Sequence, residues 1–377
     1  MKQKILIVSD TYYPKVDGTV KFIEEFLKRA SRHFDIRLLV PNFSQTKRRS
    51  EHQTTYLDLS TILRPLPSYP SIKLSISNLR KIKQEIQHTD IVFVQGPALV
   101  SLLAIYLGKF YNKKVIFYTH VLSWELLKTS SSKFRTKIGA KLLQKIFAFS
   151  FNRCTKILLP YPDLKATIKD MGVKTPIEIA KLGVDIHLFS SPSSKALAKK
   201  QRGIDPESFV IGYLGRISPE KNTKTLVHAF QNPLLQGKKF LLIVGDGPSE
   251  LKEELHALPH CRITGFVSNP QDYLKAMDVF VMPSLTETTS LATLEAMASG
   301  LPILSTKVGF IQRYIIRNYN GLFFAKDNPP MLALKLEQLR KNQALREELG
   351  TNARKTSAYS FSWERSINRI IRILSQL

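Results

Sequence analysis

The chain has 377 residues, a formal net charge of +26 and a hydrophobic fraction of 43%. This length exceeds one ordinary core and predicts two domains, and the composition excludes a disordered or fibrous chain. The two cysteines, Cys154 and Cys261, form neither a CxxC pair nor part of a Cys/His cluster at zinc spacing, which argues against a disulfide framework and a structural zinc site.

No segment of the sequence is predicted to span a membrane. The opening "MKQKILIVSD" is a short apolar run ended by Ser9 and Asp10, which is typical of a strand rather than of a secretory signal. The apolar run 98–107 is far shorter than the roughly 20 residues that a spanning helix needs. We therefore expect a cytoplasmic protein whose membrane contact, if it has one, is peripheral and on the inner face.

Short apolar runs alternate with amphipathic segments through the first half of the chain. Strands are predicted at residues 5–10, 36–40, 90–96, 114–120 and 156–161. The segment 19–33 has apolar residues at helical spacing, and a further helical run separates the strands at 90–96 and 114–120. This alternation predicts an α/β domain with a parallel sheet and helices on both faces.

The same rhythm starts again near residue 209. Strands are predicted at residues 209–216, 240–248, 261–267, 279–284 and 301–306, with a helix at 222–231. We therefore expect two doubly wound Rossmann-like domains, residues 1–188 and 189–361. The segment 183–208, rich in Ser and Lys, is the predicted join. The last residues, 362–377, read as an amphipathic helix that packs back on the first domain.

Polar residues that follow the strands of the second half indicate a ligand site. In open α/β sheets, ligands bind beyond the carboxyl ends of the strands. Arg216 and Lys221 follow the strand at 209–216 and suit a diphosphate, Arg as a planar fork and Lys as a point charge. Gly245-Asp246-Gly247 follows the next strand.

The segment "PSLTETTSLATLEAMASGLP" (283–302) places two acids at the start of a predicted helix. Free amides and neighbouring hydroxyls at a helix N-terminus bind phosphate, whereas a carboxylate would repel it. Glu287 and Glu295 therefore need another role, and carboxylates accept hydrogen bonds from vicinal sugar hydroxyls. One acid could hold a ribose and the other a hexose. Alternatively, Glu295 is a solvated helix residue and Glu287 an acid that the helix dipole stabilises.

These motifs together resemble the retaining family-four glycosyltransferases of GT-B fold. The resemblance rests on E-x7-E followed by "AMASGLP", on G-R-x4-K upstream, on "VGDGP" between them, on the loop 14–18 and on the terminal "FSWER". It covers nearly the whole chain and implies two Rossmann-like domains that face a central cleft. The first domain would bind the acceptor and the second a nucleotide-sugar donor.

The resemblance also implies roles for individual residues. Arg216 and Lys221 would neutralise the donor diphosphate, Glu295 would hold the ribose, and Glu287 the transferred sugar. His120 would face that sugar from the other domain, although a lone histidine is usually buried and structural. The implied catalytic residues are His120, Glu287, Arg216 and Lys221; the implied donor-binding residues are Gly18, Gly215, Arg216, Lys221, Val267, Glu287, Thr289, Ser290, Leu291 and Glu295.

Two positions depart from the family pattern. Thr288 follows Glu287 where the family often has Gly, and Asp17 precedes Gly18 where the family often has a second Gly. Asp17-Gly18 resembles the loop of members that glycosylate lipids. Gly18 itself is read either as a close approach to phosphate or as a glycine at the start of a helix.

The reaction that the resemblance implies is front-face displacement with retention at the anomeric carbon. Arg216 and Lys221 would stabilise the leaving diphosphate in place of a metal, so no metal and no cofactor is expected. A retaining glycosidase, with Glu287 and Glu295 across the scissile bond, is a rival use of the two acids. The cations around them favour the transferase.

Basic residues concentrate in the first half of the chain. Residues 126–156 carry eight Lys/Arg and no acid, and residues 60–84 carry five and no acid. A helix within residues 126–156 would carry bulky apolar residues between its basic charges, which favours contact with an anionic membrane surface. The alternative is a helix whose apolar face packs on the sheet and whose lysines are solvated. The predicted membrane contacts are Lys133, Arg135, Lys137, Lys141 and Lys145.

The sequence therefore predicts a hexosyltransferase with a nucleotide-sugar donor, UDP-hexose favoured over GDP-mannose, and a lipid acceptor such as diacylglycerol. The alternative is the same chemistry on a soluble sugar or sugar phosphate. A nucleic-acid-binding protein is suggested by the isoelectric point near 9.9, but no RRM-like, zinc-finger or basic-zipper signature supports specific nucleic-acid binding. The oligomeric state is left open.

Overall fold

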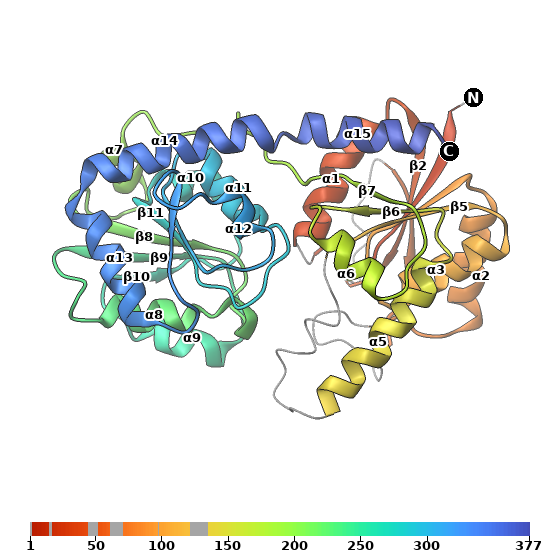
Figure 1. The fold of residues 1–377 in the computed structure, drawn as a ribbon, viewed down its shortest axis with the longest axis horizontal. Coiled ribbons are helices and arrows are strands. Elements are labelled where there is room, and N and C mark those ends of the chain that lie inside the picture. The colour runs from red at the N-terminus through yellow and green to blue at the C-terminus, as the bar shows by residue number, and fades with distance from the viewer. Residues whose placement is uncertain (1, 15–16, 44–51, 61–70, 97, 121–134) are drawn as a thin grey trace. The chain divides into compact units, whose positions relative to one another are not determined.

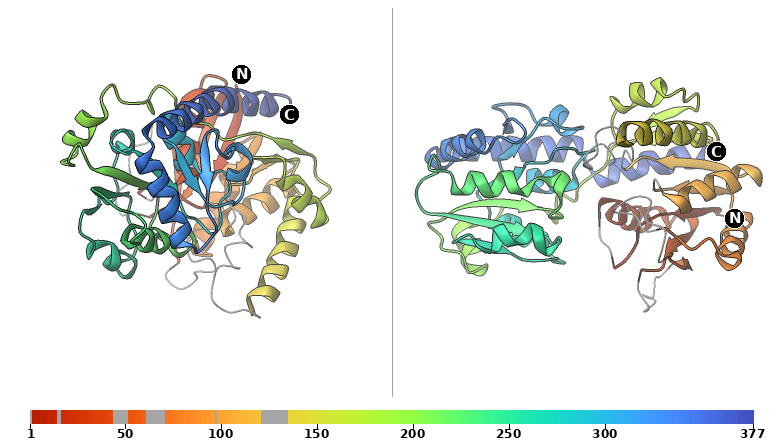
Figure 2. Two further views of the ribbon diagram at one scale, coloured as in Figure 1. Left: turned by 60° about the vertical axis from the view of Figure 1, so that its left-hand side comes forward. Right: turned by 90° about the horizontal axis from the view of Figure 1, so that it is seen from below.

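The chain forms two compact units, one of residues Met1–Leu182 with Glu364–Leu377 and one of residues Gly183–Trp363. The computed structural model describes residues 2–14, 17–43, 52–60, 71–96, 98–120 and 135–377, with side chains from residue 141 onward in the last range. Each unit is a parallel sheet with helices on both faces (Figures 1 and 2). The predicted α/β class with two doubly wound Rossmann-like domains is confirmed.

Unit 1 contains a seven-stranded sheet in the order β3-β2-β1-β4-β5-β6-β7. Its strands are β1 (Gln3–Val8), β2 (Phe34–Pro41), β3 (Gln53–Leu57), β4 (Ile91–Val94), β5 (Lys114–Tyr118), β6 (Lys156–Leu159) and β7 (Ile177–Ile179). All neighbouring strands pair in parallel. The short polar strands β3 and β7 lack a continuous apolar run, which is why the sequence pattern does not predict them.

The helices of unit 1 are α1 (Gly18–Ala30), α2 (Ile76–Gln87), α3 (Leu99–Phe110), α5 (Arg135–Phe151), α6 (Leu164–Asp170) and α15 (Trp363–Ser375). Along the chain, α2 packs on α3 and α3 on α5 (Figure 1). Residues Glu364–Leu377, which include nearly all of α15, belong to this unit, and Ser366 Oγ donates to the carbonyl of Lys181. The predicted terminal helix therefore does pack with the first domain.

An aromatic cluster forms the core of unit 1 between α1 and the sheet. The rings of Phe22 and Phe26 on α1 lie 6.3 and 5.3 Å from that of Phe93 on β4. Phe22 also stacks on Tyr118 of β5 at 4.7 Å. Burial of several large rings stabilises this side of the sheet and fixes the strand ends above it.

Unit 2 contains a six-stranded parallel sheet in the order β10-β9-β8-β11-β12-β13. Its strands are β8 (Phe209–Leu214), β9 (Lys239–Val244), β10 (Cys261–Ile263), β11 (Val279–Met282), β12 (Ile303–Ser305) and β13 (Gly321–Phe323). The chain reverses its direction of winding between β8 and β11, which are neighbours in the sheet. In such sheets the loops on either side of this switch point diverge and leave room for a ligand.

The helical elements of unit 2 follow its strands. They are α7 (Lys195–Gln201), η1 (Pro219–Lys221), α8 (Thr223–Gln231), α9 (Ser249–His256), α10 (Pro270–Lys275), α11 (Leu291–Ala298), α12 (Ile311–Tyr314), α13 (Pro329–Lys341) and α14 (Gln343–Ser360). Helix α11 packs on α14 and on its own strands β11 and β12. The start of α11 is thereby held at the switch point.

Candidate functional site

One side of the switch point of unit 2 is formed by the loop that follows β8. This loop contains Gly215 and Arg216, and the loop after β9 packs directly against it. An added Cβ at Gly245 would lie 1.9 Å from the carbonyl oxygen of Gly215, and both glycines have φ of +147°. Only glycine allows this backbone at this separation. The predicted donor residue Gly215 thus has a structural reason for its identity.

Lys221 and Glu287 form an ion pair across the switch point. Lys221 Nζ lies 2.5 Å from Glu287 Oε1, and Ser284 Oγ donates to the same oxygen at 3.0 Å. The Glu287 side chain is only 7% exposed. The backbone joins the two loops as well, because the amide of Leu285 donates to the carbonyl of Glu220 at 2.9 Å. A buried carboxylate needs such partners to stay charged.

Arg216 has a fixed backbone and a half-exposed guanidinium. The Tyr213 hydroxyl donates to the Arg216 carbonyl at 2.6 Å. Burial, and next the charge of Glu287, raise the pKa of Tyr213 well above its usual value, so this phenol stays a donor. The Arg216 side chain is 45% exposed and lies 3.5 Å from the Glu220 carboxylate, on the same loop. The guanidinium can therefore reach a bound anion while its loop stays in place.

The segment Thr288–Ser290 leads into helix α11 in a defined conformation. The Phe310 amide donates to the Thr288 carbonyl at 2.8 Å, and the Tyr314 hydroxyl donates to the Thr289 carbonyl at 2.6 Å. Ser290 has φ of +59° and caps the helix by accepting from the Thr293 amide at 3.4 Å. These bonds hold the backbone that leads into α11, and the binding of an anion by the amides at this helix start stays a prediction.

Two further donor-site predictions lie on this unit. Glu295 is buried on α11, one turn after Ser290. Val267 is half-buried in the loop that follows β10, next to the exposed Phe266. The hydroxyl oxygen of Thr289 is buried and has no hydrogen-bond partner among the residues that the structure describes. Among the other predicted residues of unit 2, Gly215, Arg216 and Lys221 follow β8, Glu287, Thr289 and Ser290 follow β11, and Leu291 and Glu295 lie on α11.

The predicted site residues of unit 1 lie at the ends of its central strands. His120 follows β5 and is buried, with Nε2 2.8 Å from Gln95 Oε1. Gly18 is the first residue of α1, and Asp17 Oδ1 caps this helix by accepting from the amides of Thr19 and Val20 at 3.0 and 3.1 Å. The interpretation of Gly18 as a glycine at the start of a helix therefore matches its place, and its contact with phosphate stays a prediction.

Sequence reasoning missed several residues that hold this site. Ser284, Tyr213 and Tyr314 support the two loops through side-chain hydrogen bonds. Gly309 has φ of +50°, and an added Cβ there would lie 2.0 Å from the Glu287 carbonyl oxygen. Each is an ordinary residue in a strand, a loop or the short helix α12, and no spacing rule connects it with Glu287. Gln95 could have been found, because it directly follows a buried strand, as His120 does.

Of the predicted membrane contacts, Lys141 and Lys145 are exposed on α5. Lys133 and the side chains of Arg135 and Lys137 lie outside the described residues. On the same helix, Leu142, Ile146 and Phe149 are 59%, 40% and 54% exposed. The Arg153 guanidinium lies 3.3 Å from the centre of the Phe149 ring. Helix α5 therefore presents bulky apolar side chains and basic charges to solvent together.

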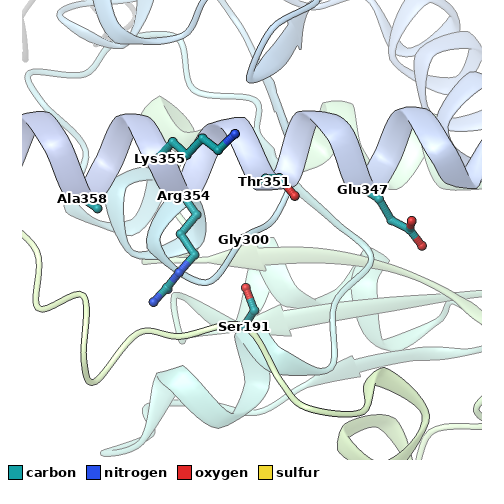
Figure 3. Close-up of a pocket in the computed structure, with 7 residues that line it drawn as sticks. All are labelled: Ser191, Gly300, Glu347, Thr351, Arg354, Lys355 and Ala358. Carbon is teal, nitrogen blue, oxygen red and sulfur yellow. The ribbon is translucent and has the colours of Figure 1, made fainter.

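A separate pocket of about 420 Å³ lies in unit 2, at the carboxyl-terminal end of α11 (Figure 3). It is lined by Ser191, Gly300, Glu347, Thr351, Arg354, Lys355 and Ala358, none of which is a predicted site residue. Arg354 donates there to the carbonyls of Phe189, Ala298 and Ile186. This guanidinium therefore caps α11 and fixes the chain at 186–189.

Within the described ranges, no group of three or more His, Cys, Asp or Glu side chains has the arrangement of a metal site. Within the same ranges, no helix is long and apolar enough to cross a bilayer.

Comparison with known families identifies the class. Residues 16–188 match the model described as Glycosyltransferase Family 4, and residues 194–356 match that described as Glycosyl transferases group 1. The two matches together span most of the chain, which therefore belongs to this family of glycosyltransferases. The family resemblance read from the sequence motifs is confirmed.

Two relatives indicate how far the likeness extends. The chain is 30% identical over 203 residues to the D-inositol 3-phosphate glycosyltransferase of Paenarthrobacter aurescens, covering 50% of this chain and 49% of that one. It is 25% identical over 372 residues to the alpha-monoglucosyldiacylglycerol synthase of Acholeplasma laidlawii, covering 93% and 91%. The chain thus aligns with about half the length of the first relative and with nearly all of the second.

A solved structure shares the fold. The Anabaena Alr3699/HepE protein in complex with UDP and glucose superposes with a TM-score of 0.80 at 17% identity over 100% of both chains. The two-domain architecture is therefore that of the GT-B glycosyltransferases.

Proposed function

We propose that this protein is a retaining hexosyltransferase that moves a hexose from a nucleotide-sugar to a membrane lipid acceptor such as diacylglycerol. UDP-hexose is the favoured donor. The observation that carries the donor half is the Lys221–Glu287 pair beside Arg216 at the switch point of unit 2. The similarity to a protein solved with UDP and glucose supports the donor class, and the similarity to a glucosyldiacylglycerol synthase supports the acceptor class.

The chemistry follows from the charges at this site. The bond between the anomeric carbon and the diphosphate oxygen breaks, and an acceptor hydroxyl forms the new bond on the same face. Arg216 and Lys221 take up the negative charge that develops on the leaving diphosphate, so metal is not needed. A phosphate oxygen accepts the proton of the acceptor hydroxyl. Glu287 holds Lys221 in place and accepts hydrogen bonds from the transferred sugar.

The start of α11 binds the phosphate side of the donor in this proposal. The amides of Thr289, Ser290 and Leu291 supply hydrogen bonds, and the partnerless Thr289 hydroxyl is one further donor at the same place. Glu295 holds the ribose hydroxyls, Gly215 lets its loop approach the donor closely, and Val267 contacts the base. His120 and Gly18 of unit 1 contact the sugar and the phosphates in the same proposal.

The exposed face of α5 supports the proposal that the acceptor is a membrane lipid. A helix that sets exposed Leu142, Ile146 and Phe149 among exposed Lys141 and Lys145 suits the interface of an anionic membrane. The apolar side chains enter the acyl boundary while the ammonium groups stay at the headgroups. In this proposal the protein is peripheral and lies on the inner face of the membrane.

A second surface of unit 1 has the same character. Leu74, Ile76 and Leu79 are exposed around the start of α2, beside the exposed Lys73 and Arg80. Helices α2 and α5 both pack against α3, and both run between parallel strands of one sheet. Two apolar and basic surfaces on one domain favour contact with a bilayer over two unrelated partners.

The test uses purified protein and radiolabelled UDP- and GDP-sugars. Each donor is incubated with anionic liposomes that contain diacylglycerol and, in parallel, with soluble sugars and sugar phosphates. Label that partitions into the organic phase is the expected result and identifies the donor. Label that appears only in the aqueous phase as new glycoside contradicts the lipid acceptor.

The alternative acceptor is a soluble sugar phosphate. The similarity to a D-inositol 3-phosphate glycosyltransferase favours it, although the aligned part covers about half of each chain. In that case activity is independent of liposomes, and the basic residues of α5 serve solubility. The stereochemistry is tested separately, since the anomeric proton coupling of the product distinguishes retention from inversion.

A further inference from the structure

Gln95 and His120 meet at the ends of two adjacent strands of unit 1. Gln95 directly follows β4, and His120 comes two residues after the end of β5, which pairs with β4. Gln95 Oε1 lies 2.8 Å from His120 Nε2, and both residues are buried, Gln95 with an exposure of only 1%. This hydrogen bond therefore links the two strand ends through their side chains.

The surroundings of His120 keep its imidazole neutral. The ring lies 4.9 Å from Phe22 on α1 and 4.6 Å from Tyr118 on β5. The Tyr118 hydroxyl donates away from it, to the Ala180 carbonyl at 2.7 Å. Burial among these rings lowers the pKa of His120 to about 3. A neutral imidazole carries one N–H, so the neighbouring group decides which nitrogen holds it.

The backbone at Gln95 is held in place by its neighbours. The backbone amide of Gln95 donates to the Val8 carbonyl at 2.8 Å. The next residue, Gly96, packs on Asp10 so closely that an added Cβ would lie 2.3 Å from Asp10 Oδ2. Asp10 in turn accepts from the amides of Ala98 and Val100 at 2.8 and 3.1 Å. The carboxylate of Asp10 is thus committed to the start of α3, and the backbone of Gln95 and Gly96 is fixed beside it.

Stability does not explain a glutamine at this position. Its amide nitrogen Nε2 is buried and has no hydrogen-bond partner among the residues described. Leaving such a group unpaired costs about 1–3 kcal/mol, which an apolar side chain of similar volume would avoid. In the described part of the chain, the hydrogen bond of this side-chain amide is the one with His120, so we look for its chemical role there.

We propose that Gln95 is a positioning residue that holds the proton of His120 on Nε2 and fixes the ring at the site of the transferred sugar. A glutamine oxygen only accepts, so the ring nitrogen that faces it must carry the hydrogen. Nδ1 is then the nitrogen with the lone pair, and this is the state of the ring in the proposed contact of His120 with the transferred sugar. The inference rests on the proposed function for the presence of that sugar, and on the geometry of unit 1 for the rest.

The test reads the ring of His120 directly. Histidine labelled with ¹⁵N in the ring gives tautomer-specific nitrogen shifts, and the His120 signals among the eight histidines are those lost in His120→Gln. We expect the unliganded protein to show a neutral ring with the proton on Nε2. In Gln95→Leu, and in Gln95→Asn if that variant folds better, the shifts should report a mixture of tautomers. An unchanged tautomer in both variants overturns the proposal.

A charge at the same position gives a second readout. Gln95→Glu places a carboxylate against Nε2, and an opposite charge at this distance raises a pKa by about 1–3 units. The ionisable Tyr118 packs on the ring, and its hydroxyl donates to the Ala180 carbonyl instead of to His120. The midpoint of His120 titration should therefore rise in Gln95→Glu. A midpoint equal to that of the natural protein counts against the contact.

Thr119→Val serves as the matched control. Thr119 is the buried neighbour of His120, and its hydroxyl has no hydrogen-bond partner in the described part of the chain. The variant should leave the His120 tautomer unchanged, so a change there shows that the signal reports packing alone and overturns the proposal. In transfer assays, Gln95→Leu should lower kcat/KM about tenfold, the effect of one lost hydrogen bond.

The two levels of inference fail in different ways. The nitrogen shifts need no substrate, so they test the positioning role even if the protein transfers no hexose. If transfer occurs but the tautomer is independent of Gln95, the positioning role is wrong and the proposed function stands.

Discussion

Lys221 and Glu287 are 66 residues apart in the sequence, and the Lys221 ammonium lies 2.5 Å from the Glu287 carboxylate. One follows β8 and the other follows β11, the two strands on either side of the switch point. The pair keeps the Lys221 ammonium next to the start of α11, and the buried Glu287 carboxylate balances its charge. A bound diphosphate would share this cation without a large rearrangement.

Lys221→Ala and Glu287→Ala should each abolish transfer and leave the fold intact. Loss of one preorganised charge at a developing anion lowers kcat by about 10²–10³-fold. The matched control is Lys224→Ala, because Lys224 is 65% exposed and pairs with Glu254 away from this site. Initial rates and circular dichroism on all three variants check the prediction. Near-normal turnover in either site variant contradicts the role of that residue.

Glu295→Ala should weaken donor binding more than it slows the chemical step. A buried carboxylate that accepts from ribose hydroxyls contributes about 1.5–3 kcal/mol, so KM for the donor should rise about 10- to 100-fold. Isothermal titration with UDP measures the same loss without an acceptor. Glu250→Ala, on α9 in the same unit, is the control and should bind UDP normally. Unchanged UDP affinity in Glu295→Ala excludes the ribose contact.

Gly309→Ala should damage the site through the backbone of its neighbour. The new Cβ would lie 2.0 Å from the Glu287 carbonyl oxygen, at a φ of +50°. We expect a loss of about 1–3 kcal/mol in unfolding free energy and a lower transfer rate. Gly172→Ala is the control for backbone strain without a steric clash, because Gly172 has φ of +85° and open space around it. If both variants lose the same stability, the contact with Glu287 has no effect.

Lys141 and Lys145 should contribute to binding of anionic vesicles. Each basic residue near such a surface adds about 1 kcal/mol, so the double alanine variant should bind about 30-fold more weakly. Co-sedimentation with phosphatidylserine-containing liposomes measures this, and the difference should shrink in high salt. The paired control replaces two exposed lysines of unit 2, Lys200 and Lys341. Equal losses for the two pairs show that net charge alone drives the binding.

Unit 2 should lose stability in acid, because Glu337 then becomes protonated. Its hydrogen bonds from Arg340 lower its pKa from 4.5 to about 2. A carboxylate whose pKa is lower in the folded state contributes stability that is present above pH 4.5 and is lost as the pH falls toward 2. Urea unfolding at pH 5 and pH 3 should show this loss, and Glu337→Gln should show less of it. An equal pH dependence in the variant contradicts the assignment.

The repeated strand and helix pattern was sufficient to predict the fold class. Buried strands such as β1, β4, β8 and β11 are continuous apolar runs, because both faces of a parallel sheet are covered. The strands that escaped prediction are β3, β7 and β13, in short or polar segments that pairing with a neighbour stabilises. A short segment carries too few residues for a periodic signal.

The sequence by itself determined the residue types at the strand ends and, through the combination of E-x7-E with G-R-x4-K and "VGDGP", the family. It also determined that basic and apolar side chains alternate along α5. Only the tertiary structure decided that Lys221 pairs with Glu287, that Gly309 lies under the Glu287 carbonyl, and that Gln95 faces His120. The reason is physical: strand order and chain reversal bring these residues together, and neither leaves a mark in local spacing.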